Sequence, residues 1–279
     1  MMSNILSVFG ASGFVGSEFC KEYVNEVYKE PRTSINPSYT NVVYFISTTD
    51  NYNVFTNPEL DISTNLIHLI RVLEGSRKNG VKLFTFISSW FVYGECLLPA
   101  TENSCCKPKG FYSITKKAAE DLVESYCKTY SIDFLILRMS NLYGITDGGV
   151  SKKKNALQYI IRELHNGNEV NLYNNGDFLR DYLHVNDAVK AIKIAIESNL
   201  RNEIINIGSG KKINFKYLID IAINELNSLS TIKSIDPPEF HKLIQVKDFY
   251  MNVMKITNLG FIPSIQIEDG IVELCRSIK

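Results

Sequence analysis

The sequence predicts an α/β protein in which a doubly wound parallel sheet carries a smaller C-terminal lobe. Three observations support this fold class. Apolar, β-branched runs alternate with helical patterns over the first half of the 279-residue chain, a glycine-rich turn follows the first run at once, and the alternation becomes irregular after residue 144. Alternating strands and helices indicate parallel strands with helices on both faces of the sheet.

The chain begins with a predicted strand, turn and helix. Residues 4–9 predict a short buried strand, Gly10–Gly16 a turn with the sequence GASGFVG, and residues 17–29 a helix. In this context the first glycine permits a tight turn, the second lets the backbone approach a pyrophosphate, and the third allows close helix–strand packing. The start of the helix would then face the negative charge of the phosphates.

The next stretch departs from a dinucleotide-binding fold. Such a fold places a second strand here, which ends in an acidic residue for the adenosine ribose about 20 positions past the glycines. Residues 31–40 are instead polar and contain two prolines, and a strong strand is predicted only at 41–47. We therefore expect a shortened second-strand region without an acidic ribose ligand. Arg32 would be either a contact for an adenosine 2′-phosphate or a solvated loop arginine.

The remaining elements of the sheet follow in order. A helix is predicted at 62–78, and a strand at 81–88 leads into Ser89. Another strand is predicted at 133–139, and it leads into the sequence SNLYG.

Beyond residue 144 the pattern predicts a separate lobe. Its predicted elements are a loop at 147–149, helices at 155–166, 189–197, 215–227 and 269–277, and strands at 170–173 and 204–207. We assign residues 1–147 and 181–206 to a dinucleotide-binding domain. Residues 148–180 and 207–279 then form a substrate-binding lobe over the carboxyl edge of the sheet, where open α/β sheets bind ligands.

Composition excludes several classes of function. Lys+Arg and Asp+Glu balance at 30 each, so no basic surface for nucleic acid is predicted. No apolar run approaches the ~20 residues that cross a bilayer, and the N-terminus lacks the pattern of a signal peptide. The 6 cysteines show no CxxC spacing, which favours reduced thiols over a zinc site. We expect a cytoplasmic protein without a metal.

Tyr112 and Lys116 form the most informative pair of polar residues. They stand four residues apart in a run of helix formers, so their side chains share one helical face. A lysine ammonium beside a phenol favours the phenolate and lowers the phenol pKa, which gives a general acid/base for a sugar or alcohol hydroxyl. The spacing is common by itself, so its weight depends on the other motifs.

Those motifs occur together in one order, with Ser89 after a strand and Asn141 in a loop after the next. GASGFVG, ISSWFVYG, YSITK, LRMSNLYG and FLRDYLHVND resemble the extended short-chain dehydrogenase/reductases of the nucleotide-sugar epimerase/dehydratase family over nearly the whole chain. The resemblance implies a Rossmann-like sheet, NAD or NADP as cofactor, a nucleotide-diphosphate sugar as substrate, and hydride transfer at a sugar carbon. It also implies a homodimer formed by the helices at 62–78 and 113–129.

The resemblance also implies roles for individual residues. Ser89, Tyr112 and Lys116 would be catalytic: the serine binds the reacting sugar oxygen, the tyrosine is the acid/base, and the lysine is its partner and a ribose ligand. Asn141 and Arg180 would bind the substrate together with Ser89, unless Arg180 pairs with Asp177 or Asp181. The implied cofactor-binding residues are Gly10, Ser12, Gly13, Phe14, Val15, Gly16, Asn65, Tyr112 and Lys116.

The resemblance leaves the reaction open between two kinds of hydride transfer. Trp90 and Phe91 stand where the 4,6-dehydratases of the family carry acidic residues, so dehydration is not expected. C4 epimerisation is the first hypothesis, and an NAD(P)H-dependent 4-keto-reductase of a nucleotide-deoxysugar is the second. A non-catalytic nucleotide-sugar-binding protein is the third. His184 is expected to pack or hydrogen-bond locally, and Trp90 to be a core or pocket-wall aromatic.

Overall fold

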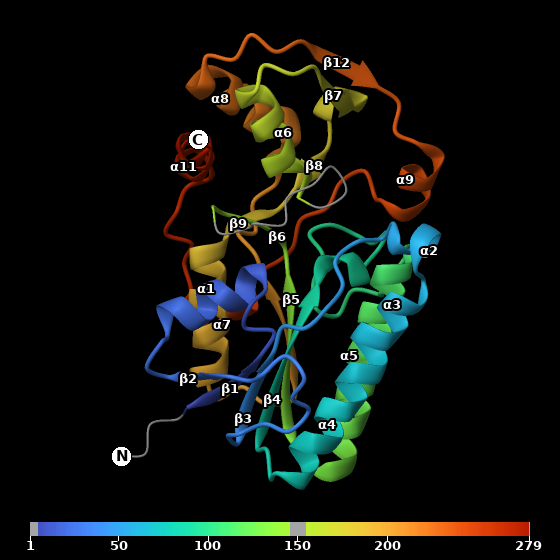
Figure 1. Ribbon diagram of the computed structural model, residues 1–279, viewed down its shortest axis with the longest axis vertical. Helices are drawn as coiled ribbons and strands as arrows, with labels where there is room; N and C mark the ends of the chain where they lie inside the picture. The colour runs from blue at the N-terminus through green and yellow to red at the C-terminus, as the bar shows by residue number, and fades with distance from the viewer. Residues whose placement is uncertain (1–4, 146–154, 279) are drawn as a thin grey trace.

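The computed structural model describes residues 5–145 and 155–278. At its centre is a six-stranded parallel sheet with the order β10-β5-β4-β3-β1-β2, covered by helices on both faces (Figure 1). The predicted fold class is confirmed. The sheet strands are β1 (Leu6–Phe9), β2 (Val27–Lys29), β3 (Asn41–Tyr44), β4 (Leu83–Ser89), β5 (Asp133–Met139) and β10 (Glu203–Ile207). The covering helices are α1 (Phe14–Glu22) and α7 (Val185–Glu197) on one face, and α4 (His68–Lys78) and α5 (Phe111–Tyr130) on the other.

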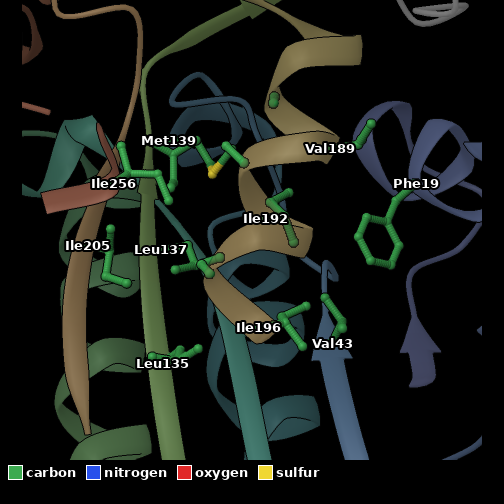
Figure 2. Close-up of a cluster of buried hydrophobic side chains, with 14 of the residues drawn as sticks. Phe19, Val43, Leu135, Leu137, Met139, Val189, Ile192, Ile196, Ile205 and Ile256 are labelled. Carbon is green, nitrogen blue, oxygen red and sulfur yellow. The ribbon is translucent and has the colours of Figure 1, made fainter. Parts of the chain in front are cut away.

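The central strands are buried on both faces, and alternate side chains enter two separate cores. On β5, Leu137 packs in the core beside α1 and α7, whereas its neighbour Ile136 packs in the core beside α4 and α5. Figure 2 shows Phe19 of α1 and Ile192 of α7 in the first of these cores. Burial on both faces explains why these strands read as continuous apolar runs rather than as alternating patterns.

The first helix is shorter than the sequence predicts. α1 ends at Glu22, and residues 27–29, which we expected to be helical, form β2 beside β1 at the edge of the sheet. Val27 and Tyr28 favour an extended strand, because β-branched and aromatic residues fit a pleated surface. The second strand is short, as expected. Glu30 follows it directly, however, so the prediction that no acidic residue ends this strand is wrong.

The helix predicted at 62–78 is confirmed, and it contains an irregular segment. Three helical segments follow one another without a break: α3 (Glu59–Ile62), the π-helical η1 (Ser63–Ile67) and α4. A π-helical segment adds one residue to a turn and occurs often at functional sites. Asn65 lies within it and is 2% exposed.

A third core, distinct from the two on the faces of the sheet, forms the C-terminal lobe, at the top of Figure 1. Its main elements are α6 (Ala156–His165), β7 (Val170–Tyr173), α8 (Phe215–Leu226), β12 (Ile232–Ile235) and α11 (Ile267–Ser277). The three helices and β7 agree with the predicted helices and strand, whereas β12 was not predicted, and the loop predicted at 147–149 lies outside the described residues. The smaller elements are α2 (Asn53–Thr56), η2 (Trp90–Val92), β6 (Asn141–Tyr143), η3 (Asn174–Gly176), β8 (Leu179–Arg180), β9 (Tyr182–His184), β11 (Ile213–Asn214), α9 (Glu239–Ile244) and α10 (Met254–Thr257).

The predicted division into two domains stays a prediction, and the position of α10 does not fit the predicted boundary. Ile256 and Phe261 lie in the same core as β5 and α7, so this part of 207–279 packs on the sheet rather than in the upper lobe. Across the described ranges, none of the helices is long and apolar enough to span a membrane.

Candidate active site

A cavity of about 960 Å³ lies between the carboxyl edge of the sheet and the C-terminal lobe. The start of α1, the segment after β3, the end of β4, the first turn of α5 and β6 line it from the sheet side. Segments of β7, β8 and α9 line it from the lobe. The position agrees with the rule that open parallel sheets bind ligands beyond the carboxyl ends of their strands.

The glycine turn lies where the cavity meets α1. Gly10 has a φ of +83°, which glycine adopts without strain, and a Cβ on Gly16 would lie 2.3 Å from the Gly10 carbonyl oxygen. The nine-residue α1 therefore begins close against this turn, with unpaired N–H groups at its start. This arrangement fits a pyrophosphate. The residues of the turn that line the cavity are Gly13, Phe14, Val15 and Gly16, whereas Gly10 and Ser12 do not line it.

Glu30 is an acidic residue at the end of β2 that we missed in the sequence, and it does not itself line the cavity. Its carboxylate is buried and accepts hydrogen bonds from the backbone N–H of Ser38 (2.7 Å) and from the Ser38 hydroxyl (3.3 Å). The signal was present: the sequence Val-Tyr-Lys-Glu ends 20 positions after Gly10, where a ribose ligand is expected. Because we predicted a helix over 17–29, we did not recognise Glu30 as the residue that follows a strand.

Tyr112 lies in the first turn of α5, and its ring lines the cavity edge-on to Phe91, with centroids 6.0 Å apart. Burial is the main cause that raises the pKa of Tyr112 to about 12; the nearby Ser89 and Ser47 hydroxyls oppose the rise, and the charge of Asp61 adds to it. The expectation of a phenol pKa lowered by Lys116 is therefore wrong for this structure. At neutral pH the phenol is protonated and is a proton donor.

Lys116 explains this difference. Its Nζ donates a hydrogen bond to the Ile87 carbonyl at 2.6 Å and lies 4.1 Å from the centroid of the Phe86 ring. Burial lowers the pKa of Lys116 to about 7, and Glu120, one turn further along α5, opposes that shift. Lys116 lines the same cavity as Tyr112, as the spacing predicts, but its charge is directed to the backbone of β4.

The serine pair at the end of β4 separates into two environments. Ser89 lines the cavity, and its Oγ accepts the N–H of Phe91 at 3.3 Å, which caps η2. Ser88 is buried and donates to Glu120 at 2.6 Å. Both serines line the cavity, but the Ser88 hydroxyl already donates its hydrogen to Glu120, so the Ser89 hydroxyl is the one available to donate to a ligand.

Asn65 does not line the cavity. Its Oδ1 accepts hydrogen bonds from Ser47 and from the N–H of Thr48, and its Nδ2 donates to the hydroxyls of Thr48 and Thr115. These four bonds use the full capacity of a side-chain amide. Direct contact with the cofactor, as the resemblance implied, is therefore not supported, and Asn65 instead connects the segment after β3 to α5.

Asn141 and Arg180 both line the cavity. Asn141 opens β6 and binds the Asp181 carbonyl through its backbone N–H (3.1 Å) and its side-chain amide (3.0 Å). Arg180 is 7% exposed, and its guanidinium donates to the carbonyls of Val246 (2.8 Å) and Lys247 (2.6 Å). A third hydrogen bond, to the Leu179 carbonyl, is 2.8 Å long.

The acidic neighbours do not neutralise Arg180. Asp181 accepts N–H groups from Ser209 and Gly210 instead, and no ion pair joins Arg180 to a carboxylate within residues 5–145 and 155–278. Burial lowers the pKa of Arg180, while Tyr182 and Asp248 act in the opposite direction. The guanidinium thus remains a buried cation on the cavity wall, stacked on aromatic rings, with hydrogen-bonding capacity left for an anion.

The two remaining predicted residues have local contacts. His184 Nε2 lies 3.1 Å from Glu273 Oε2, and burial lowers the pKa of this histidine. Trp90 is stacked between Phe91 (4.1 Å) and Phe249 (4.5 Å) and lines the cavity, as expected for a pocket-wall aromatic.

The comparisons with known proteins agree with this geometry. A model of the NAD dependent epimerase/dehydratase family matches residues 35–208. A putative UDP-glucose 4-epimerase from Methanocaldococcus jannaschii is 31% identical over 229 residues, which are 81% of this chain and 73% of that protein. A dTDP-4-dehydro-6-deoxyglucose reductase from Escherichia coli is 25% identical over 240 residues, 85% of this chain and 74% of that protein.

Solved structures share the fold. A UDP-N-acetylglucosamine 4-epimerase from Methanobrevibacter ruminantium, in complex with UDP-N-acetylmuramic acid, superposes with a TM-score of 0.89 at 20% identity and covers 99% of this chain and 98% of its own. A UDP-glucose 4-epimerase from Thermotoga maritima, with UDP-glucose, superposes with a TM-score of 0.87 at 21% identity. The match covers 98% of this chain and 97% of that one. RMD from Pseudomonas aeruginosa, complexed with NADPH, superposes with a TM-score of 0.86 at 20% identity, and the match covers 98% of each chain.

Proposed function

Because the chain belongs to the NAD-dependent epimerase/dehydratase family, we propose that it epimerises a nucleotide-diphosphate sugar at C4, with NAD or NADP as cofactor. The observation that carries the proposal is one cavity in which Ser89, Tyr112 and Lys116 lie beside the start of α1. A phosphate-binding helix start and an acid/base in the same cavity suit a dinucleotide enzyme that moves a hydroxyl proton.

The residues divide the work between the two ligands. Gly13 and the start of α1 hold the pyrophosphate, and the bound nicotinamide supplies hydride transfer. Ser89 binds the reacting sugar oxygen, and Tyr112 exchanges a proton with that oxygen as the sugar carbon is oxidised or reduced. Arg180 offers its remaining N–H groups to the substrate diphosphate.

Glu30 favours NAD over NADP within this proposal. A carboxylate at the end of the second strand accepts hydrogen bonds from the adenosine ribose and repels a 2′-phosphate. Calorimetry should therefore give tighter binding of NAD than of NADP, and Glu30→Gln should reduce the difference. Equal affinity of the native protein for both cofactors would contradict this assignment.

A 4-keto-reductase is the second candidate, and one observation favours it. Burial raises the pKa of Tyr112 to about 12, so the phenol is ready to give a proton to a keto oxygen. An epimerase needs the same group to accept a proton first. Oxidised nicotinamide carries a positive charge, which would lower the phenol pKa once bound.

One assay separates the candidates. Purified protein is incubated with UDP-glucose, UDP-N-acetylglucosamine or dTDP-glucose without added cofactor, and the sugars are analysed after hydrolysis. An epimerised product supports the first candidate. Activity that requires a nucleotide 4-keto-6-deoxysugar and NAD(P)H supports the second. Binding of nucleotide-sugar without either reaction would indicate a non-catalytic binding protein.

A further inference from the structure

We propose that Tyr52, Phe55 and Phe240 form an aromatic latch at the rim of the cavity, and that the nucleotide-sugar enters and leaves when this latch opens. Tyr52 immediately precedes α2 and Phe55 lies within it, on the sheet side, whereas Phe240 belongs to α9 of the lobe. Figure 1 shows α2 and α9 facing each other at the right of the molecule. The inference rests on the proposed function, since it concerns the passage of that substrate.

Three ring contacts form the latch. The ring of Phe240 packs edge-on against Phe55, with centroids 4.6 Å apart, and against Tyr52 at 5.1 Å. The rings of Tyr52 and Phe55 lie 6.2 Å from each other. Edge-to-face packing is an arrangement that aromatic pairs favour. The flanking residues Asn51 and Pro238 line the cavity, so the latch lies where its two walls meet.

Each side of the latch is attached to a different wall. On the sheet side, the amide of Asn53 in α2 donates to Asp61 of α3 at 3.2 Å, and Asp61 is fully buried. On the lobe side, the ring of His241 in α9 lies 4.7 Å from the ring of Tyr173 in β7. The latch therefore joins an element of the sheet domain to an element of the lobe across the cavity rim.

Both helices are weakly packed, so the latch is able to open. α2 contains no buried residue, α9 contains one, Ile244, and the side chain of Phe55 is 65% exposed. Segments with few buried apolar contacts open at a low cost in free energy while the rest of the fold stays intact. Such opening sets the rate of ligand release in many enzymes.

The two phenylalanines of the latch do not line the cavity, whereas Tyr52 does. Removing the Phe240 ring should therefore weaken the closed state equally in the free protein and in the ligand complex. The rate constants of association and dissociation should then rise by the same factor, and Kd should stay unchanged. A residue that contacts the ligand would instead raise dissociation alone.

The test is stopped-flow binding to the native protein and to Phe240→Ala. Trp90 is the only tryptophan of the chain and lines the cavity, so its fluorescence reports on the ligand. The probe is whichever of UDP-glucose, UDP-N-acetylglucosamine and dTDP-glucose binds the native protein most tightly by calorimetry. Two aromatic contacts correspond to about a tenfold change in an equilibrium constant. We expect both rate constants to rise about tenfold, with Kd within about twofold of the native value.

Matched variants separate the latch from a general disturbance of α9. Phe240→Tyr keeps the ring and should keep the native rates. Leu243→Ala should also keep them, because Leu243 lies on the same helix and is 67% exposed. Phe55→Ala should raise both rate constants as Phe240→Ala does. Combining the two should add little, since both substitutions remove the same contact.

Three outcomes of the binding experiment would overturn the proposal. They are native rate constants in Phe240→Ala, a rise in the dissociation rate constant alone, and an equal rise in Leu243→Ala. Thermal unfolding of each variant checks that the fold is kept. If Phe240→Ala does not fold, Phe240→Leu replaces it, and the same parallel rise of both rate constants is expected.

Hydrogen exchange followed by mass spectrometry tests the latch without any ligand. Phe240→Ala should speed amide exchange in residues 51–57 as well as in residues 238–245, although only the second segment carries the substitution. Leu243→Ala should leave exchange in 51–57 unchanged. Native exchange over 51–57 in Phe240→Ala overturns the proposal. If the native protein binds none of the three nucleotide-sugars, the proposed function fails, while this measurement still decides whether the latch exists.

Discussion

Two buried arginines show how differently one side chain is used in two regions of the molecule. Arg138 of β5 makes a two-pronged ion pair with Glu120, with Nη2–Oε2 and Nε–Oε1 distances of 2.7 and 3.0 Å. Ser88 adds a hydroxyl to the same carboxylate. Arg180, on the cavity wall, contacts carbonyl acceptors and aromatic faces, and within the described part of the chain no carboxylate pairs with it.

The difference teaches which polar cluster stabilises the fold and which is open to a ligand. A buried charge with a carboxylate partner is neutralised inside the protein, so the interior cluster of Ser88, Glu120 and Arg138 is complete. A buried cation without such a partner carries a desolvation cost that an incoming anion can offset. Substitutions in the first region should therefore change stability, and those in the second should change binding and turnover.

The largest effect is expected in the interior cluster. Arg138→Met should lower the free energy of unfolding by about 3–5 kcal/mol, because it leaves the Glu120 carboxylate buried without its partner. Urea denaturation measures the change. Glu120→Gln added to Arg138→Met should recover part of the loss, since it removes the unpaired charge. A loss below about 1 kcal/mol would contradict the division between the two regions.

In the cavity, Tyr112→Phe should reduce turnover by at least ~100-fold, because it removes the general acid/base. The same variant should keep its free energy of unfolding within about 1 kcal/mol of the native value, since Tyr112 lines the cavity and phenylalanine keeps its ring. Steady-state rates and urea denaturation of one preparation check both statements. Native-like turnover would remove Tyr112 from the mechanism.

A smaller effect is expected for Arg180→Lys. Lysine keeps the charge but loses the planar fork that binds a diphosphate and the backbone carbonyls together, so KM for the nucleotide-sugar should rise about tenfold. Arg276→Lys is the matched control, because Arg276 forms an exposed surface pair with Glu225 away from the cavity lining. If both variants have the native KM, the diphosphate does not bind at Arg180.

The smallest effect concerns pH and Lys116. Burial lowers the pKa of Lys116 to about 7, below the usual lysine value, so above pH 7 the unfolded chain binds more protons at this position than the folded chain does. Stability should then rise with pH, by about 1 kcal/mol between pH 7 and 8 at most. Urea denaturation across this range should show that rise in the native protein and not in Lys116→Met. If the free energy of unfolding changes with pH in the same way in both proteins, Lys116 keeps an ordinary pKa.

The predicted dimer stays a prediction, and the surface of α4 and α5 is compatible with it. Ile67 and Ile70 on the helix at 62–78 and Ile114 on α5 are each 40–48% exposed. Light scattering of the native protein would test the prediction, and a monomer would contradict it.

The amino-acid sequence by itself determined the features that depend on neighbours along the chain. The alternation of strands and helices, the GASGFVG turn, Ser89 at the end of a strand and the shared face of Tyr112 and Lys116 all follow from local periodicity and from the small size of glycine. The resemblance to the family depended on the same local motifs, and the family match confirms it.

Only the tertiary structure decided what those residues contact and how they are charged. The carbonyls that bind Arg180 and the Ile87 oxygen that holds Lys116 come from distant segments, so no local spacing could identify them. The pKa of a buried group depends on desolvation and on such partners. For this reason the pKa of Tyr112 is higher than the presence of Lys116 four residues away suggested. Glu30 was missed for a related reason: a three-residue strand exists only because the rest of the sheet pairs with it.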